Sequence, residues 1–332
     1  MVRIALLGCG RIGQLHALNI AQNPDAELAY VYDVYQPSAD ALGNLYGCPV
    51  AISVEEILGS DAVDAVLIAT STDTHADLLE ASAKAGKAIL CEKPIDLSLE
   101  RVLQCAKNIA PYDVPIQIGF NRRFDPSHRA AQAAVASGEI GDLHQVVITS
   151  RDPEMAPKAY LETSGGMIRD MTIHDFDLAR FMLNEEPVEV FAQASALVNP
   201  AVCAEVGDVD SAMILMKTAS GKLCHINNSR QAVYGYDQRV ELFGSAGMLI
   251  SDNQRPHDLK HFSADQAGKS EPYQYFFLER YAEAFVAELD AFVKAVNEKT
   301  TPEVGFDDGA KALALAEAAY KSLATGKSVS VD

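Results

Sequence analysis

Two acidic residues and a histidine recur at helical spacing in the segment GGMIRDMTIHDFD, residues 165–177. On a helix, Asp170, His174 and Asp177 lie at positions i, i+4 and i+7 and share one face. Histidine has an unperturbed pKa of about 6.5 and can take a proton from a hydroxyl group near neutral pH. An aspartate one turn away can orient the imidazole and stabilise its cation. The spacing therefore suits acid–base chemistry, although a packed helix with a satisfied histidine and an ion pair has the same pattern.

A glycine-rich motif, GCGRIG, marks a second candidate site near the start of the chain. Gly8, Gly10 and Gly13 match G-x-G-x-x-G between an apolar run that we expect to be a strand and a helical pattern. The glycines permit a tight turn, close approach of a pyrophosphate, and close packing of helix on strand. Asp33 ends the next expected strand and can bind a ribose 2′-hydroxyl while repelling a 2′-phosphate. The motif predicts a dinucleotide site that prefers NAD to NADP.

Lys93, in the segment CEKPI (91–95), is a third candidate. It follows an expected parallel strand, at the carboxyl edge where such sheets bind ligands. An ordinary surface lysine before a proline is the alternative interpretation. A dehydrogenase that removes hydride from a carbinol carbon must also remove the hydroxyl proton, and histidine suits that role.

The first third of the chain alternates strands with helices. Helical patterns lie at 11–24, from Ser53, at 73–86 and from Ser98. Between them lie apolar runs that we expect to be strands, at 2–8, 26–33, 64–70, 87–94 and 114–120. This alternation predicts βαβ units and a parallel sheet.

From about residue 143 the pattern changes to consecutive strand-like runs joined by turns. A helix at 165–183 is the only expected interruption, and helices at about 275–297 and 307–325 complete the chain. The runs lie at 143–151, 188–198, 209–218, 221–230, 238–245 and 247–252. Strands without crossover helices predict a largely antiparallel sheet. We therefore predict an α/β Rossmann domain of residues 1–120 and an open-faced α+β domain of residues 121–332, with the last helix able to return to the first domain.

Composition excludes several classes of protein. A chain of 332 residues exceeds one ordinary core, which favours two domains. The net charge of −19 argues against nucleic acid and anionic membrane surfaces as partners. Six cysteines without Cys-x-x-Cys spacing predict reduced, mostly buried thiols. No export signal and no apolar run of about 18 residues is present, so we expect a cytoplasmic protein without a membrane segment.

Several segments together resemble the Gfo/Idh/MocA oxidoreductase family, and within it the inositol dehydrogenase group. The resemblance covers nearly the entire chain and implies a Rossmann domain followed by an open-faced α+β domain. The segments are GCGRIG, CEKP, GFNRRFDPS, GGMIRDMTIHDFDLARFML, VYGYDQRVELFGS and FFLERYAEAF.

The resemblance also implies a reaction and a catalytic group. Lys93, Asp170 and His174 would form that group: His174 would take the hydroxyl proton, and Asp170 would hold the imidazole. Lys93 would bind the reacting oxygen and join the proton relay. The implied reaction is NAD-dependent oxidation of a cyclic polyol, with myo-inositol first, to 2-keto-myo-inositol (scyllo-inosose).

Further site residues are carried over from the same resemblance. Arg122 is assigned to the cofactor or to a salt bridge. The open sheet implies a homo-oligomer, as the dimer face of a tetramer or as a dimer. The substrate-binding residues would be Lys93, Asn121, Arg123, Asp170, His174, Tyr234 and Tyr236. The cofactor-binding residues would be Gly8, Gly10, Arg11, Ile12, Gly13, Asp33, Thr70, Ser71, His75, Glu92 and Lys93.

Three other functions stay open at this point. A metal-dependent hydrolase would use Asp170, His174 and Asp175 or Asp177 as ligands, but no second histidine stands out and we expect no metal. A non-catalytic NAD-sensing protein would have no need of a base. A related dehydrogenase would act on scyllo-inositol, chiro-inositol or an aldose pyranose.

Overall fold

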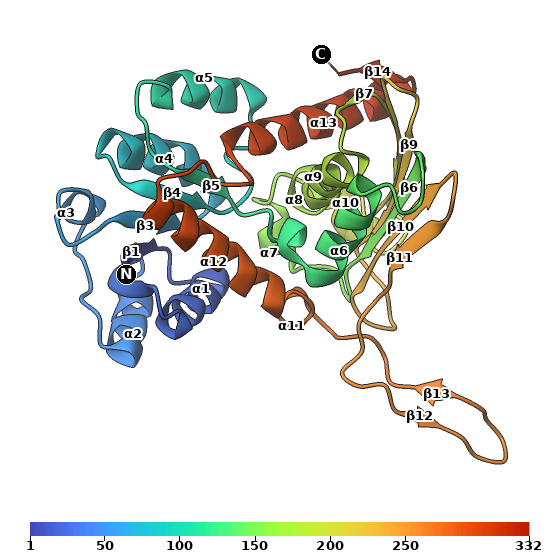
Figure 1. The fold of residues 1–332 in the computed structure, drawn as a ribbon, viewed down its shortest axis with the longest axis horizontal. Coiled ribbons are helices and arrows are strands. Elements are labelled where there is room, and N and C mark those ends of the chain that lie inside the picture. Colours follow the sequence, from blue (N-terminus) through green and yellow to red (C-terminus); the bar gives the residue numbers. More distant parts are fainter. Residues whose placement is uncertain (332) are drawn as a thin grey trace. The chain divides into compact units, whose positions relative to one another are not determined.

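The computed structural model describes residues 1–331, which form two compact units (Figure 1). The first unit contains Met1–Phe124 and Glu283–Leu313, and the second contains Asp125–Ala282 and the chain from Ala314 onward. We predicted a division near residues 119–121 and a return of the last helix. In the structure, most of α12 (Ala282–Glu298) and the first turns of α13 (Phe306–Thr325) group with the first unit.

Helix α12 groups with the first unit because its apolar face completes the core of that unit. Leu289, Phe292 and Val293 are buried in one cluster with residues of the first sheet. Burying one such side chain contributes about 1.5–3 kcal/mol. Helical periodicity predicts the apolar face of a helix but does not say which core the face joins.

The first unit is built on a five-stranded parallel sheet in the order β2-β1-β3-β4-β5. Its central strands are buried along their whole length, as in sheets that are covered on both faces. The strands are β1 (Val2–Leu7), β2 (Ala26–Tyr32), β3 (Ala65–Ile68), β4 (Ala88–Cys91) and β5 (Ile116–Ile118).

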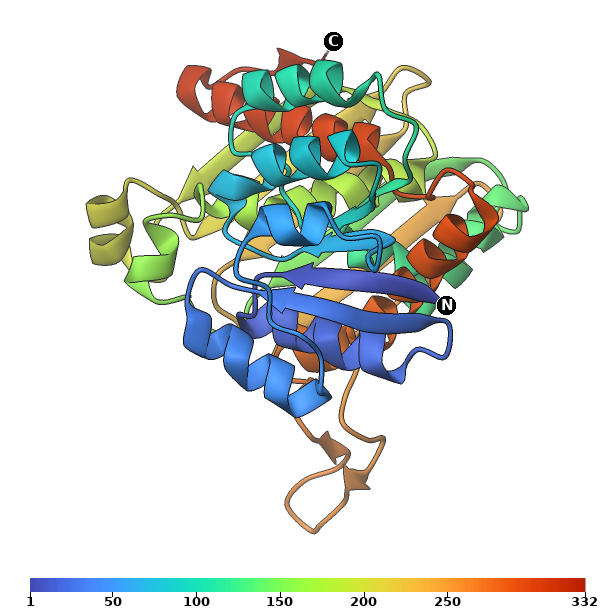
Figure 2. The same ribbon diagram turned by 90° about the vertical axis from the view of Figure 1, so that its left-hand side faces the viewer.

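Helices pack on both faces of this sheet. Two of them, α1 (Arg11–Gln22) and α2 (Gln36–Tyr46), share a core cluster with α12. Helix α4 (His75–Lys84) has no residue in that cluster. It packs on β3 and β4 and against α5 (Leu99–Ile109). Figure 2 faces this unit and shows its strands in blue and teal beside these helices. The shorter elements are α3 (Val54–Leu58), η1 (Thr72–Thr74) and η2 (Asn121–Phe124).

The second unit contains a seven-stranded sheet in the order β11-β10-β6-β9-β8-β7-β14. Strands β6 and β9 pair in parallel, and the other neighbours pair antiparallel. The predicted combination of a parallel α/β sheet and a largely antiparallel α+β sheet is confirmed. The strands are β6 (Leu143–Arg151), β7 (Pro187–Ser195), β8 (Ser211–Thr218), β9 (Leu223–Ser229), β10 (Asp237–Gly244), β11 (Met248–Ser251) and β14 (Val329–Ser330).

The prediction of one continuous helix at 165–183 is wrong, because the segment forms two helices. A break at Met171 separates α8 (Met167–Asp170) from α9 (Thr172–Leu183). The expectation of a single interrupting helix is also wrong, since α7 (Lys158–Leu161) and α10 (Pro200–Val206) lie between the same strands. Both are short, and their sequences lack a helical apolar repeat long enough to detect.

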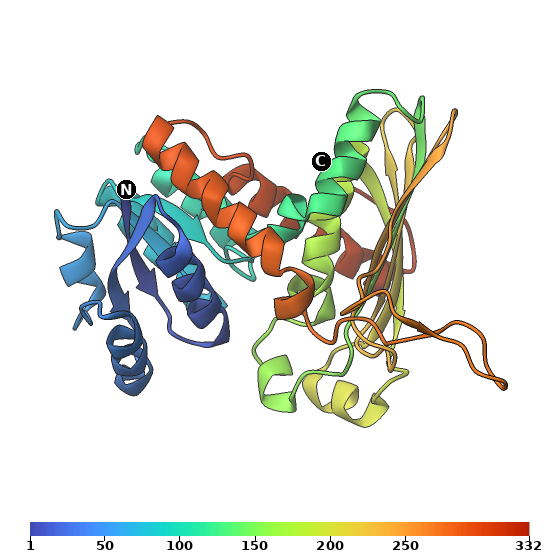
Figure 3. The same ribbon diagram turned by 60° about the horizontal axis from the view of Figure 1, so that its bottom comes forward.

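One face of the second sheet is covered by helices and the other is open. α9 packs on β6 and β9, and α6 (Pro126–Ala136) packs on β11 and against α9. Figure 3 shows this sheet edge-on, with no helix of the described chain over its outer face. Large apolar side chains on that outer face are 39–57% exposed: Val188, Met213, Leu215, Leu223, Phe243, Met248 and Ile250.

The remaining elements are small. A two-stranded hairpin, β12 (Lys260–His261) and β13 (Lys269–Ser270), precedes α11 (Phe277–Arg280). All six cysteines are free, and five of them are buried, as predicted. Burial raises the pKa of Cys9 and of Cys105 to about 12, so these thiols are unreactive near neutral pH. Within residues 1–331, no helix is both long and apolar enough to span a membrane.

Candidate active site

The glycine-rich turn joins β1 to α1 and leaves no room for a side chain at two of its glycines. Gly8 has a φ of +97°, and a Cβ atom there would lie 2.3 Å from the carbonyl oxygen of Ala69. A Cβ atom on Gly13 would lie 2.0 Å from the carbonyl oxygen of Gly8. At Gly10, nothing lies within 4 Å of such an atom, so an anion has room to approach the backbone. The first turn of α1 carries no acidic residue, which suits phosphate binding by its amides.

Asp33 follows β2 and accepts two backbone hydrogen bonds. Its Oδ2 accepts from the N–H of Cys9, at 2.7 Å, and its Oδ1 from the N–H of Tyr35, at 2.8 Å. These bonds hold the carboxylate against the glycine-rich turn, and each oxygen keeps a lone pair for a further donor. A ribose diol supplies such donors, whereas a 2′-phosphate meets a negative charge.

His75 ties together two loops at the carboxyl edge of the first sheet. Its Nδ1 lies 2.8 Å from the carbonyl oxygen of Pro94, and its Nε2 lies 3.1 Å from that of Thr70. The Thr70 hydroxyl also lies 2.7 Å from that of Thr74. Ser71 immediately precedes η1 in the same loop. Because only 2% of His75 is exposed, its clearest role is to hold the loop that carries Thr70 and Ser71.

Glu92 and Lys93 follow β4 at the same edge. Oε1 of Glu92 lies 2.8 Å from Nε2 of His16, on α1. Burial raises the pKa of Glu92, but the hydrogen bond and charge of His16 and the charge of Lys93 outweigh it, so this pKa lies below its ordinary value. Glu92 therefore carries a negative charge directly before Lys93. A Cβ atom on Gly119 would lie 3.0 Å from Oε2 of Glu92, so glycine leaves space for this carboxylate.

The predicted residues Asn121 and Arg123 lie on η2, at the end of the first stretch of the first unit. Asn121 and Arg122 are each 3% exposed. Arg123 donates from Nη2 to Oδ1 of Asp308, at 2.8 Å. Arg123 thus has a partner within the first unit, and its contact with substrate stays a prediction.

In the second unit, α8 begins after two glycines with positive φ. Gly165 has a φ of 84° and Gly166 one of 85°. A Cβ atom on Gly166 would lie 2.6 Å from the hydroxyl of Tyr320 and 2.9 Å from Oδ1 of Asp208. Both carboxylate oxygens of Asp208 accept from the N–H of Met167, at 3.0 Å each. These contacts fix the residue at which α8 starts.

Asp170, the last residue of α8, is held from two sides. Tyr160, on α7, donates its hydroxyl to Oδ1 of Asp170 at 2.7 Å. Arg230, directly after β9, places Nη1 3.5 Å from Oδ2 of Asp170 and Nη2 3.7 Å from Oδ2 of Asp208. The Arg230 side chain is only 2% exposed, so its charge offsets two acids inside the protein. Burial and the charge of Asp170 raise the pKa of Tyr160, which keeps its hydroxyl a donor.

His174 lies in the first turn of α9, and most of that helix is buried. Asp175 accepts from Nδ2 of Asn228 at 2.8 Å, and Asp177 pairs with Nη1 of Arg180 at 3.5 Å. Asp175 and Asp177, the two alternative third ligands of the hydrolase hypothesis, therefore both have protein partners. In the part of the chain that the structure describes, no group of three or more histidine, cysteine or acidic side chains is placed to hold a metal ion.

The two tyrosines predicted to bind a polyol lie in different environments. The Tyr234 hydroxyl accepts from Nη1 of Arg151 at 2.8 Å and donates to Oδ2 of Asp237 at 2.7 Å. Tyr236 is 5% exposed, and its ring packs edge-on against Tyr281 with centroids 6.2 Å apart. Tyr234 is thus part of a polar network, whereas the ring of Tyr236 is part of the core.

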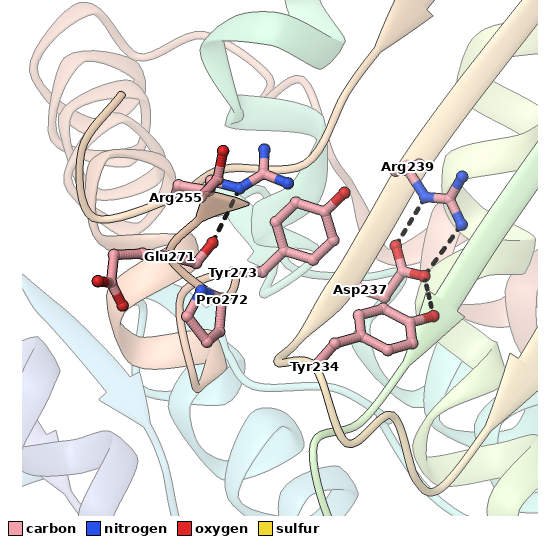
Figure 4. Close-up of a pocket in the computed structure, with 8 residues that line it drawn as sticks. Tyr234, Asp237, Arg239, Arg255, Glu271, Pro272 and Tyr273 are labelled. Atoms are coloured by element: carbon pink, nitrogen blue, oxygen red, sulfur yellow. Dashed lines mark hydrogen bonds and ion pairs between the residues drawn. The ribbon is translucent and has the colours of Figure 1, made fainter. Parts of the chain in front are cut away.

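A pocket of about 530 Å³ opens beside Tyr234 (Figure 4). On one wall, the Arg239 guanidinium and the Tyr234 hydroxyl both donate to the carboxylate of Asp237. On the other, the Arg255 guanidinium lies 4.5 Å from the centre of the Tyr273 ring. These groups offer both donors and acceptors to a polar small molecule.

Tyr160, Arg230 and His16 were not among the predicted site residues. Tyr160 lies on α7, a helix of four residues that is too short for the sequence to reveal. Arg230 gives one weak signal, its position at the end of an expected strand. His16 falls at helical spacing among the buried residues of α1, which indicates that its ring faces the sheet but not that it meets Glu92.

Comparison with known families matches both parts of the chain. Residues 2–120 match the model of an oxidoreductase family with an NAD-binding Rossmann fold, and residues 128–250 match that of the GFO/IDH/MocA C-terminal domain. The chain is 46% identical to an inositol 2-dehydrogenase from Rhizobium meliloti (strain 1021), with 99% of each chain covered. It is 42% identical to a myo-inositol 2-dehydrogenase from Thermotoga maritima, over 100% of this chain and 99% of the relative.

A solved structure extends this similarity to a complex. The scyllo-inositol dehydrogenase from Lactobacillus casei with bound cofactor NAD(H) and scyllo-inositol has a TM-score of 0.91 to this chain and 28% sequence identity. The match covers 100% of this chain and 99% of that one.

Proposed function

Since the chain belongs to the Gfo/Idh/MocA family of oxidoreductases, we propose that it oxidises inositol, and first of all myo-inositol to 2-keto-myo-inositol. The chain is an NAD-dependent dehydrogenase that acts on a CH–OH group. The choice of substrate depends on one observation, the full-length similarity to two inositol 2-dehydrogenases. A related polyol or sugar is the second candidate, because a scyllo-inositol dehydrogenase has the same fold.

We propose Lys93, Asp170 and His174 as the catalytic group. NAD supplies the acceptor for the hydride that leaves the carbinol carbon. His174 takes the hydroxyl proton at a ring nitrogen as the carbonyl forms, and Lys93 binds the reacting oxygen and joins the proton relay. Asp170 orients the imidazole and stabilises its cation.

The surroundings of Asp170 support this assignment. A carboxylate orients an imidazole only if it is itself held in place. Tyr160 and Arg230 hold Asp170 from opposite oxygens, at 2.7 Å and 3.5 Å. The ordinary alternative, a packed helix with an ion pair, fits Asp177 and Arg180 better, because they are buried and paired with each other.

We propose that the first unit binds NAD through its glycine-rich turn and carboxyl-edge loops. The open space at Gly10 and the absence of an acidic residue in the first turn of α1 support phosphate binding there. The two backbone hydrogen bonds of Asp33 support its assignment to the ribose. The proposed set is Gly8, Gly10, Arg11, Ile12, Gly13, Asp33, Thr70, Ser71, His75, Glu92 and Lys93.

The substrate set also includes Asn121, Arg123, Tyr234 and Tyr236. Tyr234 has the strongest support, because its hydroxyl belongs to a polar network beside a pocket. The ring of Tyr236 is packed in the core, so we assign that residue to the wall of the site.

We propose that the open face of the second sheet packs against a second copy of the chain. Apolar side chains from five of its strands alternate with the buried ones, and a contiguous apolar surface on a protein marks an interaction site. The same face on two copies can form a self-complementary two-fold interface. Such a dimer is also the building block of a tetramer.

The substrate proposal predicts that NADH forms when the purified protein receives NAD and myo-inositol. A spectrophotometric panel should contain myo-, scyllo- and chiro-inositol, an aldose pyranose and a simple 2-hydroxy acid. Turnover of the hydroxy acid without turnover of any inositol would refute the proposal. If kcat/KM is highest for scyllo-inositol, the proposed reaction class stands and scyllo-inositol replaces myo-inositol as the preferred substrate.

Replacement of the base should affect the chemical step and leave NAD binding intact. A positioned general base contributes about 10²–10⁴-fold, so His174→Ala should lower kcat by about that factor. The rise of kcat with pH that deprotonation of a histidine base produces should vanish in this variant. NAD affinity, measured by fluorescence titration, should equal that of the parent. His257→Ala, at an exposed residue before β12, serves as control. A variant that keeps its kcat but loses thermal stability would show that His174 has only a packing role.

Replacement of Asp33 should relax the cofactor preference. A 2′-phosphate about 4 Å from a carboxylate costs about 1–4 kcal/mol, depending on solvent screening. Asp33→Ser should therefore raise kcat/KM for NADP relative to NAD by about tenfold or more. Asp25→Ser makes the same change at an exposed site of the first unit and should not change kcat/KM for NADP relative to NAD. A parent enzyme that already used NADP as well as NAD would contradict the role of Asp33.

A charge in the middle of the open face should break the oligomer. Light scattering after gel filtration should give a multiple of the chain mass for the parent and a lower multiple for Leu215→Glu. Leu45→Glu, on α2, tests the same change at a side chain that is 71% exposed and outside the open face. A monomeric parent would exclude the proposed interface.

A further inference from the structure

The end of strand β9 carries two buried polar side chains, Asn228 and Arg230, two positions apart. Both face the helices of the second unit, because Asn228 contacts residues of α9 and Arg230 contacts the last residue of α8. The backbone of Arg230 is fixed as well, since its N–H donates to the carbonyl oxygen of Asp210 at 2.8 Å. One short segment of backbone therefore reaches both helices of the candidate site.

The carboxamide of Asn228 bonds to residues on both sides of His174. Its Oδ1 accepts from the hydroxyl of Thr172 at 2.8 Å, and its Nδ2 donates to Oδ2 of Asp175 at 2.8 Å. Thr172 and Asp175 are each 0% exposed. Nδ2 also donates to the carbonyl oxygen of Ser150, on the neighbouring strand β6, at 3.2 Å. The first turn of α9 is thus attached to the sheet at two residues that bracket His174.

Arg230 contacts the acids at both ends of α8. Its Nη1 lies 3.5 Å from Oδ2 of Asp170, the last residue of the helix, and its Nη2 lies 3.7 Å from Oδ2 of Asp208. Asp208 accepts from the N–H of Met167, the first residue of the helix. A helix of four residues is too short to be stable by itself, so contacts of this kind determine where α8 lies.

The break at Met171 makes both attachments relevant to the candidate site. In one continuous helix, the spacing of four residues would by itself place Asp170 next to His174. Here Asp170 ends α8, and His174 belongs to α9, which begins at Thr172. The relative position of the two side chains therefore depends on what holds each helix, and the same strand end holds both.

Packing alone does not require polar groups at this place. Thr172, Asp175 and Asn228 are shielded from water, and their hydrogen bonds add little to stability beyond the desolvation cost. Valine and leucine of similar volume would fill the space without that cost. What a fully bonded carboxamide adds is direction, because its donor and acceptor hold the turn in one orientation.

We propose that Asn228 and Arg230 are positioning residues for the dehydrogenase reaction and set the orientation of His174 relative to Asp170. Asn228 fixes the turn that carries the base, and Arg230 fixes the carboxylate that orients it. This role rests on the proposed function of Asp170 and His174. It requires no contact of Asn228 or Arg230 with the substrate or with NAD.

Thr172 offers a mild test of the attachment through Asn228. Thr172→Ser keeps the hydroxyl donor, and we expect a kcat within about threefold of the parent. Thr172→Val keeps the shape but removes the donor, and kcat should fall by about tenfold or more, because a small displacement of a catalytic group is costly. NAD affinity, measured by fluorescence titration, should not change.

Thr218→Val removes a buried hydroxyl from β8 of the same unit and serves as control, with an expected kcat equal to that of the parent. An unchanged kcat in Thr172→Val would overturn the role of Asn228. Equal losses of kcat in Thr172→Ser and Thr172→Val, or in Thr172→Val and Thr218→Val, would overturn it too.

The pKa of His174 reports on its alignment with Asp170 without reference to turnover. A carboxylate beside an imidazole raises the imidazole pKa, and a misaligned pair loses part of this effect. Thr172→Val should therefore lower the pKa of His174 by about 0.5 or more, whereas Thr172→Ser should not. The acid limb of the kcat/KM profile should move to lower pH by the same amount. The charged and titratable groups of the network are unchanged in both variants: Tyr160, Asp170, Asp175, Asp208 and Arg230.

NMR titration of isotope-labelled histidines measures this pKa, and the His174 signal is identified by its absence in His174→Ala. A pKa that is the same in the parent and in Thr172→Val contradicts the positioning role. If His174→Ala keeps its kcat, the proposed catalytic group fails, whereas the NMR comparison still tests whether Asn228 orients His174.

Arg230→Lys tests the second attachment. Lysine keeps the charge, but a single ammonium group does not replace a planar fork that meets two acids from two nitrogens. We expect kcat to fall by about tenfold or more with NAD affinity unchanged. Arg180→Lys makes the same change in a buried ion pair in the last turn of α9 and should keep kcat within about threefold of the parent. A parental kcat in Arg230→Lys, or an equal loss in Arg180→Lys, would overturn the role of Arg230.

Discussion

The close approach of α1 to the ends of β1 and β3 is the constraint on which the site of the first unit depends. Carbonyl oxygens occupy the positions that Cβ atoms at Gly8 and Gly13 would need, at 2.3 and 2.0 Å. Because the helix starts so close to the strands, its first amides lie at the carboxyl edge of the sheet, where Asp33 and the loop after β4 also end. The proposed phosphate and ribose contacts both depend on this one steric condition.

Local sequence was sufficient for the features that depend on neighbouring residues. The GCGRIG motif, the strand before it and Asp33 lie within 33 residues, and their geometry follows from glycine sterics and strand order. The α9 segment was predicted as a helix because its periodicity also depends only on neighbouring residues. The break at Met171 was not predicted, and neither was the contact by which Asp208, 41 positions further along the chain, fixes the start of α8 at Met167. Periodicity reports on one helix at a time and carries no information about such a partner.

The partners of the acids were therefore the least predictable part of the site. Asp170 was identified from its spacing to His174, but its two partners were not. Tyr160 lies 10 positions before Asp170, and Arg230 follows the end of β9. Likewise, the sequence marked CEKP, but not the contacts of Glu92 with His16 or the return of α12 to the first unit. In both units a carboxylate beside a proposed catalytic residue is held by side chains from distant elements. Contacts of this kind arise only when the whole unit packs.

The buried Arg230 also bears on the choice between an enzyme and an NAD-binding sensor. Burying Arg230 between two acids carries a desolvation cost that the resulting contacts repay only in part. Apolar side chains of similar volume commonly give equal or greater stability at such places. Stability alone therefore does not explain this arginine. Arg230 instead holds Asp170, the carboxylate that orients His174 in the proposed mechanism, and a protein that only binds NAD has no use for that orientation.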